Sequence, residues 1–357
     1  MKRALWPFLT ISLAACSAQP PAATTSQAII NGTLDDGDPN IVLVFAQVPG
    51  QSSGSLCTGE VISPHVVLTA AHCMAPSTVG AGAEFVVFTG SMLPASGPPP
   101  ADQLLKVTES HYVPTFFYNP MTGADQDDVG VLILAQPTTI APLPFNHFNL
   151  TAGDKGADVR IVGYGLTDGN DTQGTTAGTK HEAPTKLFDF QPQTLTLYDG
   201  QHSNCEGDSG GPALVMLDGK ERIAGVTQVG YVKCPVVMAS TDTRVDAYAS
   251  FIDGYVNMFD PPAVAAGGAC STDTDCGSLP CLNGICTAPC DPSAATSSCP
   301  SGTECTAVND ENMCAKASHK GCDFVPGGGS GGGGALLVIV ALALGMALRR
   351  RSGDEGA

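Results

Sequence analysis

The sequence has 357 residues, of which 42 are Gly and 27 are Pro, with 43% hydrophobic and only 14% charged residues. This composition is typical of a turn-rich β protein with an apolar core and argues against a disordered chain, which carries more charge and fewer apolar residues. The formal charge is −18 and the two basic clusters lie near the termini, so we expect no nucleic-acid partner, because phosphate binding needs a basic surface.

The chain begins with MKRALWPFLTISLAAC, a basic start followed by an apolar run and small residues. This pattern predicts an export signal over residues 1–15, because the apolar run is too short to span a bilayer. The ending LAAC resembles the lipobox of bacterial lipoproteins, which implies cleavage before Cys16 and acylation of its thiol. Ordinary signal cleavage near Ala18 is the alternative.

Residues 29–260 are predicted to be rich in strands. Apolar, β-branched runs are separated by Gly, Pro, Asn and Asp, as in IVLVFAQV, EFVVFTG, VGVLILA, DVRIVGYG and PALVMLDGKERIAGVTQVG. The last run contains an Asp-Gly hairpin signal. Helical spacing occurs in RVDAYASFIDGYV, which places Val245, Tyr248, Ile252 and Tyr255 on one face. The acidic stretch NGTLDDGDPN is predicted to be a turn rather than a calcium site, and we expect no metal.

Three short motifs in this region contain the residue types that nucleophilic catalysis by a serine needs. VVLTAAHC contains His72, DQDDVGVLIL places acids directly before an apolar strand, and CEGDSGGP contains Ser209. Acyl transfer through a covalent intermediate needs a serine nucleophile, a histidine base and a carboxylate that fixes the tautomer of the histidine. The motifs therefore predict a catalytic triad rather than a simple glycine-rich turn at Ser209.

In this order, TAAHC and GDSGGP closely resemble the motifs of the chymotrypsin-like (trypsin-fold, family S1) serine proteases over residues 29–260. The resemblance implies an all-β fold of two six-stranded antiparallel β-barrels with a C-terminal helix. It also implies a serine endopeptidase with His72 as general base, Ser209 as nucleophile and Asp128 as the orienting acid, because DVGVLIL matches the family pattern. Asp125 and Asp127 are then expected to be exposed loop acids.

The same resemblance implies the surroundings of the nucleophile. The backbone N–H groups of Gly207 and Ser209 would form the oxyanion hole, where developing negative charge needs fixed donors. Two disulfides are implied, Cys57–Cys73 beside the base and Cys205–Cys234 beside the specificity pocket.

AIINGTLDD resembles the mature N-terminus of the family, which implies a zymogen with the propeptide 16–28. Cleavage before Ile29 would free an ammonium group that pairs with Asp208, since a buried carboxylate needs a charged partner. Ala28 replaces the usual Arg or Lys, so the activating protease is not expected to be trypsin-like. If Cys16 is acylated, the same cleavage would remove the lipid together with the propeptide.

By alignment, Ser203 lies at the base of the primary specificity pocket, with Gly230 and Ser240 at its walls. Trypsin-like members carry an aspartate at the base to pair with Arg or Lys, so we expect a neutral P1 residue, the residue before the cleaved bond. Glu206 beside the oxyanion loop either disfavours acidic residues near that bond or is a solvated rim charge.

Residues 261–318 form a cysteine-rich segment with too few apolar residues for a core, so four disulfides are expected to supply its stability. Their pairing is open, since eight cysteines allow on the order of a hundred connectivities, and a zinc site is disfavoured because no histidine is interleaved. The spacing loosely resembles small EGF-like or dickkopf-like modules. A spacer role is favoured over binding of a target. The cysteines are Cys270, Cys276, Cys281, Cys286, Cys290, Cys299, Cys305 and Cys314.

Residues 319–357 combine Gly-Cys, a glycine linker, the apolar run Ala335 to Leu348 and an arginine cluster. As a helix this run is about 21 Å long, shorter than the hydrocarbon core of about 30 Å. The order resembles the myxobacterial C-terminal sorting tail (MYXO-CTERM), which implies Cys322 as the retained attachment point on the cell surface. A short, strained membrane anchor is the alternative.

The sequence thus predicts an exported serine endopeptidase on a bacterial cell surface or outer membrane, or released from it. Its expected partners are protein or peptide substrates, an activating protease and the machinery that anchors or sorts it, and no cofactor is expected. The alternative is a catalytically silent adhesion or recognition protein that uses the protease fold and the cysteine-rich segment for binding. Such a protein usually lacks a triad residue, and none is lost here.

Overall fold

The computed structural model describes residues 29–119, 124–217, 219–229, 234–236, 238–290, 299, 303–308 and 311–316. The predicted signal peptide, propeptide and C-terminal tail, with Cys16 and Cys322, lie outside the described residues, and so does Gly230. No helix within the described ranges has the length and apolar character needed to cross a membrane.

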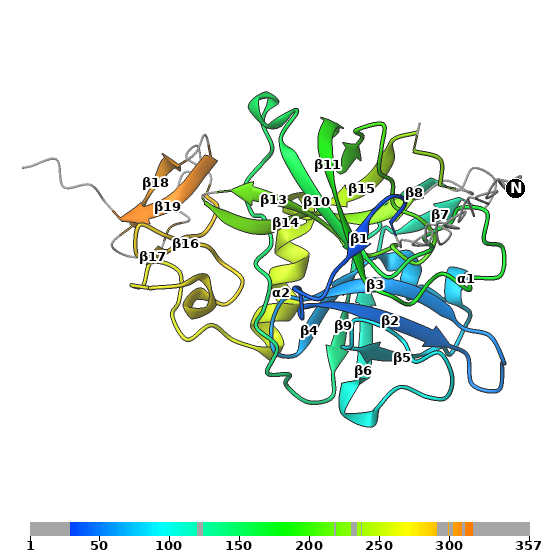
Figure 1. Cartoon of the computed structure of the whole chain (residues 1–357). Helices are drawn as coiled ribbons and strands as arrows, with labels where there is room; N and C mark the ends of the chain where they lie inside the picture. The colour runs from blue at the N-terminus through cyan, green and yellow to red at the C-terminus, as the bar shows by residue number, and fades with distance from the viewer. Residues whose placement is uncertain are drawn as a thin grey trace, which may run out of the picture. The chain divides into compact units, whose positions relative to one another are not determined.

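Six antiparallel strands close the first barrel, in the order β2-β3-β4-β9-β6-β5 (Figure 1). Aliphatic and β-branched residues dominate the strands that face the core, and all five residues of β9 are buried, because such side chains pack well on a pleated surface. The strands are β2 (Ile41–Gln47), β3 (Ser55–Val61), β4 (Val66–Thr69), β5 (Glu84–Phe88), β6 (Leu104–Tyr112) and β9 (Gly130–Leu134). A small hairpin, β7 (Phe117–Asn119) with β8 (Ala124–Gln126), precedes β9.

The second barrel follows the order β11-β10-β13-β14-β15-β12, and pairing of β12 with β11 closes the ring. The short strand β1 (Thr33–Leu34) adds to β11 at the outside. The predicted all-β class with two six-stranded antiparallel barrels is therefore confirmed. The strands are β10 (Asp158–Gly163), β11 (His181–Phe190), β12 (Thr194–Leu197), β13 (Pro212–Leu217), β14 (Lys220–Val229) and β15 (Ser240–Arg244).

The predicted C-terminal helix is α2 (Ala249–Phe259), which follows a 3-10 turn, η4 (Asp246–Tyr248). Its apolar face buries Ile252 and Val256 in the core shared with the first barrel, as the periodicity of the sequence indicated. Besides α2, the described residues contain one short α-helix, α1 (Pro76–Val79), and the 3-10 helices η1 (Ala71–Cys73), η2 (Ala101–Gln103), η3 (Ala152–Asp154) and η5 (Asp273–Cys276).

Hydrogen bonds join the two barrels directly. Tyr164, which follows β10, is fully buried, and its hydroxyl lies within hydrogen-bond distance of two backbone carbonyls of the first domain, those of Ile41 (3.1 Å) and Gly90 (2.9 Å). The larger core cluster also combines side chains of both barrels. The junction between the barrels is therefore packed and held in a fixed register.

The C-terminal region is rich in disulfides, as expected, and the structure resolves the pairing that spacing left open. Each pair of disulfides is interleaved and encloses a short hairpin, β16 (Cys281–Leu282) with β17 (Ile285–Cys286) and β18 (Thr303–Val308) with β19 (Glu311–Lys316). The bridges are Cys270–Cys281, Cys276–Cys286, Cys290–Cys305 and Cys299–Cys314.

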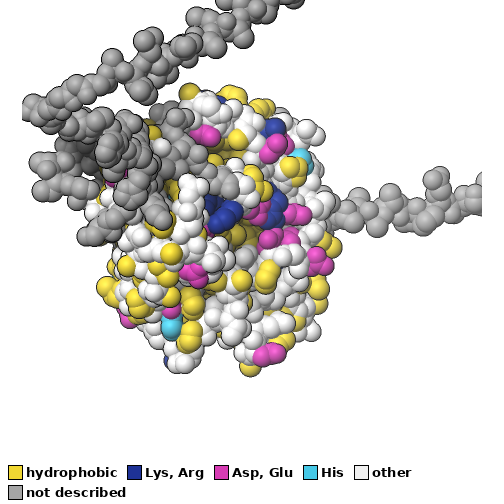
Figure 2. Space-filling view, turned by 90° about the vertical axis from the view of Figure 1, so that its left-hand side faces the viewer, with side chains coloured by type: hydrophobic (Ala, Val, Ile, Leu, Met, Phe, Trp, Pro, Cys, Tyr) yellow, Lys and Arg dark blue, Asp and Glu magenta, His cyan; other side chains and the backbone are white. Residues whose placement is uncertain are grey.

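Basic side chains on the surface lie among acidic ones. Figure 2 shows Lys and Arg beside Asp and Glu on the face in view. On β10, Arg160 contacts three carboxylates, those of Asp38, Glu182 (2.9 Å) and Glu221 (2.6 Å). Such partly exposed ion pairs contribute little to stability.

Candidate active site

His72 lies in η1, immediately after β4, where the chain is fixed on both sides. Thr69 donates a side-chain hydrogen bond to the carbonyl of Thr58 (2.7 Å), and the next residue after His72 forms the disulfide Cys57–Cys73. Both links tie the turn to β3. The turn that carries His72 is thus fixed to the first barrel by a hydrogen bond and a disulfide.

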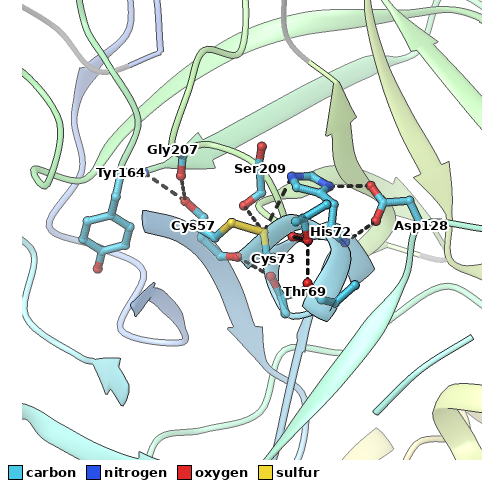
Figure 3. Close-up of a disulfide and its surroundings, with 11 residues drawn as sticks. Cys57, Thr69, His72, Cys73, Asp128, Tyr164, Gly207 and Ser209 are labelled. Carbon is cyan, nitrogen blue, oxygen red and sulfur yellow. Dashed lines mark hydrogen bonds and ion pairs between the residues drawn. A yellow bond between two sulfur atoms is a disulfide. The ribbon is translucent and has the colours of Figure 1, made fainter. Parts of the chain in front are cut away.

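Asp128 holds the histidine through both of its carboxylate oxygens (Figure 3). The backbone N–H of His72 donates to Oδ1 (2.8 Å), and the ring Nδ1 lies 2.7 Å from Oδ2. The Asp128 side chain is fully buried and that of His72 is 18% exposed. A carboxylate at Nδ1 favours the tautomer with the proton on that nitrogen, which leaves Nε2 able to accept a proton.

Ser209 follows a tight loop of the second barrel that is bonded to the first. Thr58 on β3 makes two hydrogen bonds to this loop. Its backbone N–H donates to the carbonyl of Ser209 (2.8 Å), and the Thr58 hydroxyl donates to the carbonyl of Gly207 (2.9 Å). Cys73 Sγ lies 3.8 Å from His72 Nε2 and 3.6 Å from the carbonyl oxygen of Ser209. The structure therefore brings the three predicted triad residues to one point between the barrels (Figure 3).

The backbone of this loop requires glycine. Gly207 has φ of +98°, and a Cβ there would lie 2.7 Å from the Cα of Gly165. Among the backbone hydrogen bonds of the described residues, the N–H of Asp208 donates to Cys205 and that of Gly210 donates to Thr227, whereas those of Gly207 and Ser209 donate to no other backbone group. Two unengaged donors beside a serine are what an oxyanion hole needs.

The buried carboxylate of Asp208 accepts hydrogen bonds from the backbone around this loop. Its Oδ1 accepts from the N–H of Gly165 (2.7 Å) and its Oδ2 from the N–H of Cys205 (2.8 Å). Burial raises the pKa of Asp208 to about 7, although these two hydrogen bonds act in the opposite direction. A carboxyl group in this position would gain from a cationic partner.

Ile29 lies in the same part of the molecule. It is fully buried and has φ of +50°. The next residue, Ile30, donates its N–H to the carbonyl of Ser203 (2.9 Å), in the segment that leads to Asp208. The predicted activation residue is thus seated against the loop whose order it would control.

The predicted pocket residues Ser203 and Ser240 are both buried, at 4% and 5% exposure, and Gly230 lies outside the described residues. The Ser203 hydroxyl donates to the carbonyl of its neighbour Asn204, whose amide donates to the hydroxyl of Thr227 (3.0 Å). The side chains of Ser203, Asn204 and Thr227 thus form a buried hydrogen-bonded group that is polar and carries no charge.

Sequence reasoning missed Asp242, a fully buried acid on β15 opposite Thr227. Neither of its carboxyl oxygens has a hydrogen-bond partner. Burial raises the pKa of Asp242 to about 8, so the group stays neutral below that pH. An available signal was its place two residues after Ser240 in an alternating strand, which puts both side chains on the same face.

The prediction that Asp127 is an exposed loop acid was wrong. Its side chain is 9% exposed and accepts hydrogen bonds from Tyr248 and Gln193. The motif could not reveal this burial because both partners are distant in the sequence. The side chain of Asp125 lies outside the described residues.

A cavity of about 810 Å³ opens along the junction of the barrels and contains the site. The first barrel contributes His72, Leu56 and Tyr118, and the second contributes Ser209, Glu206 and Gln228. Ser209 and His72 therefore line the same open cavity between the barrels, and Glu206 lines it as well.

Clusters of potential metal ligands in the described part of the chain consist of cysteines that are already joined in disulfides, in one case with His72 beside them. A disulfide sulfur cannot serve as a thiolate ligand. These clusters therefore offer no built metal centre, and the expectation of a metal-free protein stays an expectation.

Comparisons with known proteins agree with this geometry. The family model described as Trypsin matches residues 39–252. Chymotrypsin-like elastase family member 1 of Macaca fascicularis is 30% identical over 220 residues, which cover 55% of this chain and 77% of that protein. The proteins of the same name from Rattus norvegicus (29% over 222 residues, 56% and 78%) and Bos taurus (29% over 231 residues, 58% and 81%) are also similar.

Proposed function

Because the chain belongs to the trypsin family of serine proteases, we propose that it is a serine endopeptidase that cleaves peptide bonds through an acyl-enzyme on Ser209. The observation that carries this proposal is the two-point hold of Asp128 on His72, at 2.8 and 2.7 Å. A structural histidine does not need a fully buried carboxylate at Nδ1 together with a cleft at Nε2.

The chemistry follows from the positions of the side chains. His72 Nε2 takes the proton of the Ser209 hydroxyl as Oγ attacks the substrate carbonyl carbon, and Asp128 stabilises the imidazolium that forms. The N–H groups of Gly207 and Ser209 stabilise the oxyanion. His72 then gives the proton to the leaving amine as the C–N bond breaks, and water hydrolyses the ester by the same steps in reverse.

A neutral P1 residue is the preference we propose. Ser203 carries no charge, and the buried Asp242 stays protonated below pH about 8, so neither residue supplies the carboxylate that binds Arg or Lys in trypsin. The matched relatives are named elastases, and an elastase pocket is small. Preferential cleavage after Arg in a peptide library would contradict this assignment.

We also propose that the protein is made as a zymogen and activated by cleavage before Ile29. No ion pair joins Asp208 to another residue of the described ranges, so a free ammonium group at the buried Ile29 would provide it with a charged partner and so order the loop of Gly207 and Ser209. The same cleavage would remove a lipid on Cys16 and leave Cys322 as the surface attachment. Active enzyme extracted from the cell surface should therefore begin at Ile29, and an N-terminus at Cys16 would contradict the scheme.

The decisive experiment treats the full chain, exported with its own signal and processed, with a fluorophosphonate probe beside a Ser209→Ala control. Labelling that needs Ser209, with cleavage of a mixed peptide library, is the expected result. A folded, disulfide-bonded protein that neither reacts nor cleaves would favour the catalytically silent recognition protein.

A further inference from the structure

The residue before Asp128 occupies an unusual backbone position. Asp127 has φ of +55°, in the left-handed region that most residues with a side chain avoid and that Asp and Asn tolerate better than others. Its carbonyl accepts from the N–H of Val129 (3.0 Å), which closes a tight turn around Asp128. The direction in which Asp128 leaves the backbone therefore depends on this turn.

Two side chains from segments that follow or join strands of the second barrel hold Asp127 in place. The Tyr248 hydroxyl donates to Asp127 Oδ1 at 2.5 Å, and the Gln193 amide donates to the same oxygen at 3.1 Å. Burial raises the pKa of Tyr248, and the bond to Asp127 raises it further, so the hydroxyl stays protonated and remains a donor well above neutral pH.

The donors are themselves fixed. Tyr248 belongs to η4, directly after β15, and Gln193 lies in the turn between β11 and β12, where its carbonyl accepts from the N–H of Arg244 (2.9 Å). Asp127, in contrast, leads into β9 of the first barrel. These hydrogen bonds therefore connect the loop that carries Asp128 to the barrel that carries Ser209.

This connection has a consequence for the site. Asp128 binds His72 through two oxygens at once, and a two-point contact tolerates little rotation of the backbone that presents it. We propose that Asp127 is a positioning residue, which sets Asp128 against His72 by anchoring the turn to the second barrel through Tyr248 and Gln193. The inference rests on the proposed function, because a positioned triad matters only if the chain is catalytic.

The test uses the full, processed chain with three substitutions at one position. Asp127→Asn keeps the acceptor oxygen and the tolerance for left-handed φ but removes the charge. Asp127→Gly keeps only the backbone freedom, and Asp127→Ala keeps neither. Each variant is measured for kcat and KM on a peptide amide, for thermal stability, and by NMR for the low-field proton on His72 Nδ1.

We expect Asp127→Ala to lower kcat by about 10- to 100-fold, because a misplacement of about 1 Å in a catalytic group costs that much. KM should stay within about twofold, since no substrate contact is lost, and the Nδ1 proton signal should shift or broaden. Asp127→Asn should retain both the activity and the signal, and Asp127→Gly should fall between the two. Asn283→Ala, which places alanine at a φ of +51° in the C-terminal region, is the matched control and should change neither kcat nor the signal.

Two results would overturn the proposal. One is an Asp127→Ala protein that folds with unchanged kcat and proton signal; the other is an Asp127→Asn protein as impaired as Asp127→Ala, which would mean that charge rather than geometry acts. If Asp127→Ala does not fold, Tyr248→Phe removes one donor, and its kcat should fall by about 3- to 10-fold; an unchanged kcat would count against the proposal.

The NMR signal separates this inference from the proposed function. A parent protein without activity, whose Nδ1 signal still depends on Asp127 in this way, would contradict the protease assignment and support the positioning role. An active parent whose signal is insensitive to Asp127 would do the reverse.

Discussion

The interior of the first barrel is mostly aliphatic, although β3 also buries Glu60, whereas the second barrel buries more polar side chains. β9 of the first barrel buries every residue of Gly-Val-Leu-Ile-Leu, while β15 of the second buries Ser240, Asp242, Thr243 and Arg244. The first barrel presents His72 and Asp128 from a rigid apolar frame. The second supplies the serine loop and the predicted specificity pocket, which need polar groups. The polar side chains around the proposed specificity pocket thus lie in the second barrel, which also has an apolar core of its own.

The largest effect should come from removing one catalytic group from either barrel. His72→Ala in the first barrel and Ser209→Ala in the second should each lower kcat by about 10⁴-fold or more, because the two groups act in one step. The double variant should be little worse than either single one. Steady-state kinetics with active-site labelling checks this, and additive losses would mean that the barrels contribute separately.

A smaller effect is expected in the apolar core of the first barrel. Leu132 on β9 is fully buried, so Leu132→Ala should lower the free energy of unfolding by about 2–5 kcal/mol through lost burial and the cavity left behind. Urea denaturation at fixed pH measures it. A loss well under about 1 kcal/mol would show that this barrel relaxes around the cavity and is not the rigid half.

In the polar interior of the second barrel, a substitution at Asp242 should raise the free energy of unfolding at high pH, whereas Leu132→Ala lowers it. The folded pKa of Asp242 is raised to about 8, while an unfolded Asp titrates near about 4. The native state thus holds a proton on Asp242 that the unfolded state loses, so the contribution of Asp242 to stability falls as the pH rises from about 4 to about 8.

Asp242→Asn removes this dependence. The variant should therefore match the parent at pH 4 and exceed it at pH 8 by several kcal/mol, because each unit between the two pKa values contributes about 1.4 kcal/mol. Denaturant midpoints at the two pH values are the measurement. A constant difference between the proteins would show that Asp242 does not titrate in this range.

The smallest effect is expected on the outside of the second barrel. Lys186 Nζ lies 2.6 Å from Asp158 Oδ1, and the side chains of the two residues are 48% and 90% exposed, respectively. Lys186→Ala should change the free energy of unfolding by less than about 0.5 kcal/mol, because exposed ion pairs contribute little. A loss above about 1 kcal/mol would show that the surface charges of this barrel matter more than its exposure implies.

Local patterns were sufficient to predict the architecture and the proposed triad. His72 and Ser209 lie in short contiguous motifs. The strands β2, β9 and β10 are apolar runs whose composition favours a strand without information from distant residues. β11 is harder to predict, because it contains Pro184, and a proline without an N–H group argues against a paired strand.

The features that sequence reasoning missed depend on contacts between distant residues. Asp127 is buried because Tyr248 and Gln193, 121 and 66 positions away, converge on it. The cysteine pairing likewise depends on where the hairpins place each sulfur, which spacing does not reveal. α2 begins only at Ala249, after the turn that Tyr248 ends, whereas the periodicity extended the helix further toward Arg244.

The backbone of Ile29 gives the proposed activation a direction. A β-branched residue at φ of +50° carries strain on the order of 1–3 kcal/mol. That torsion exists only while a carbonyl carbon precedes the nitrogen of Ile29. Hydrolysis of the bond would abolish the torsion, and rejoining the chain would have to recreate it inside a closed core. Rejoining the chain would therefore cost the strain that the cleavage releases, so the proposed activation would be effectively irreversible.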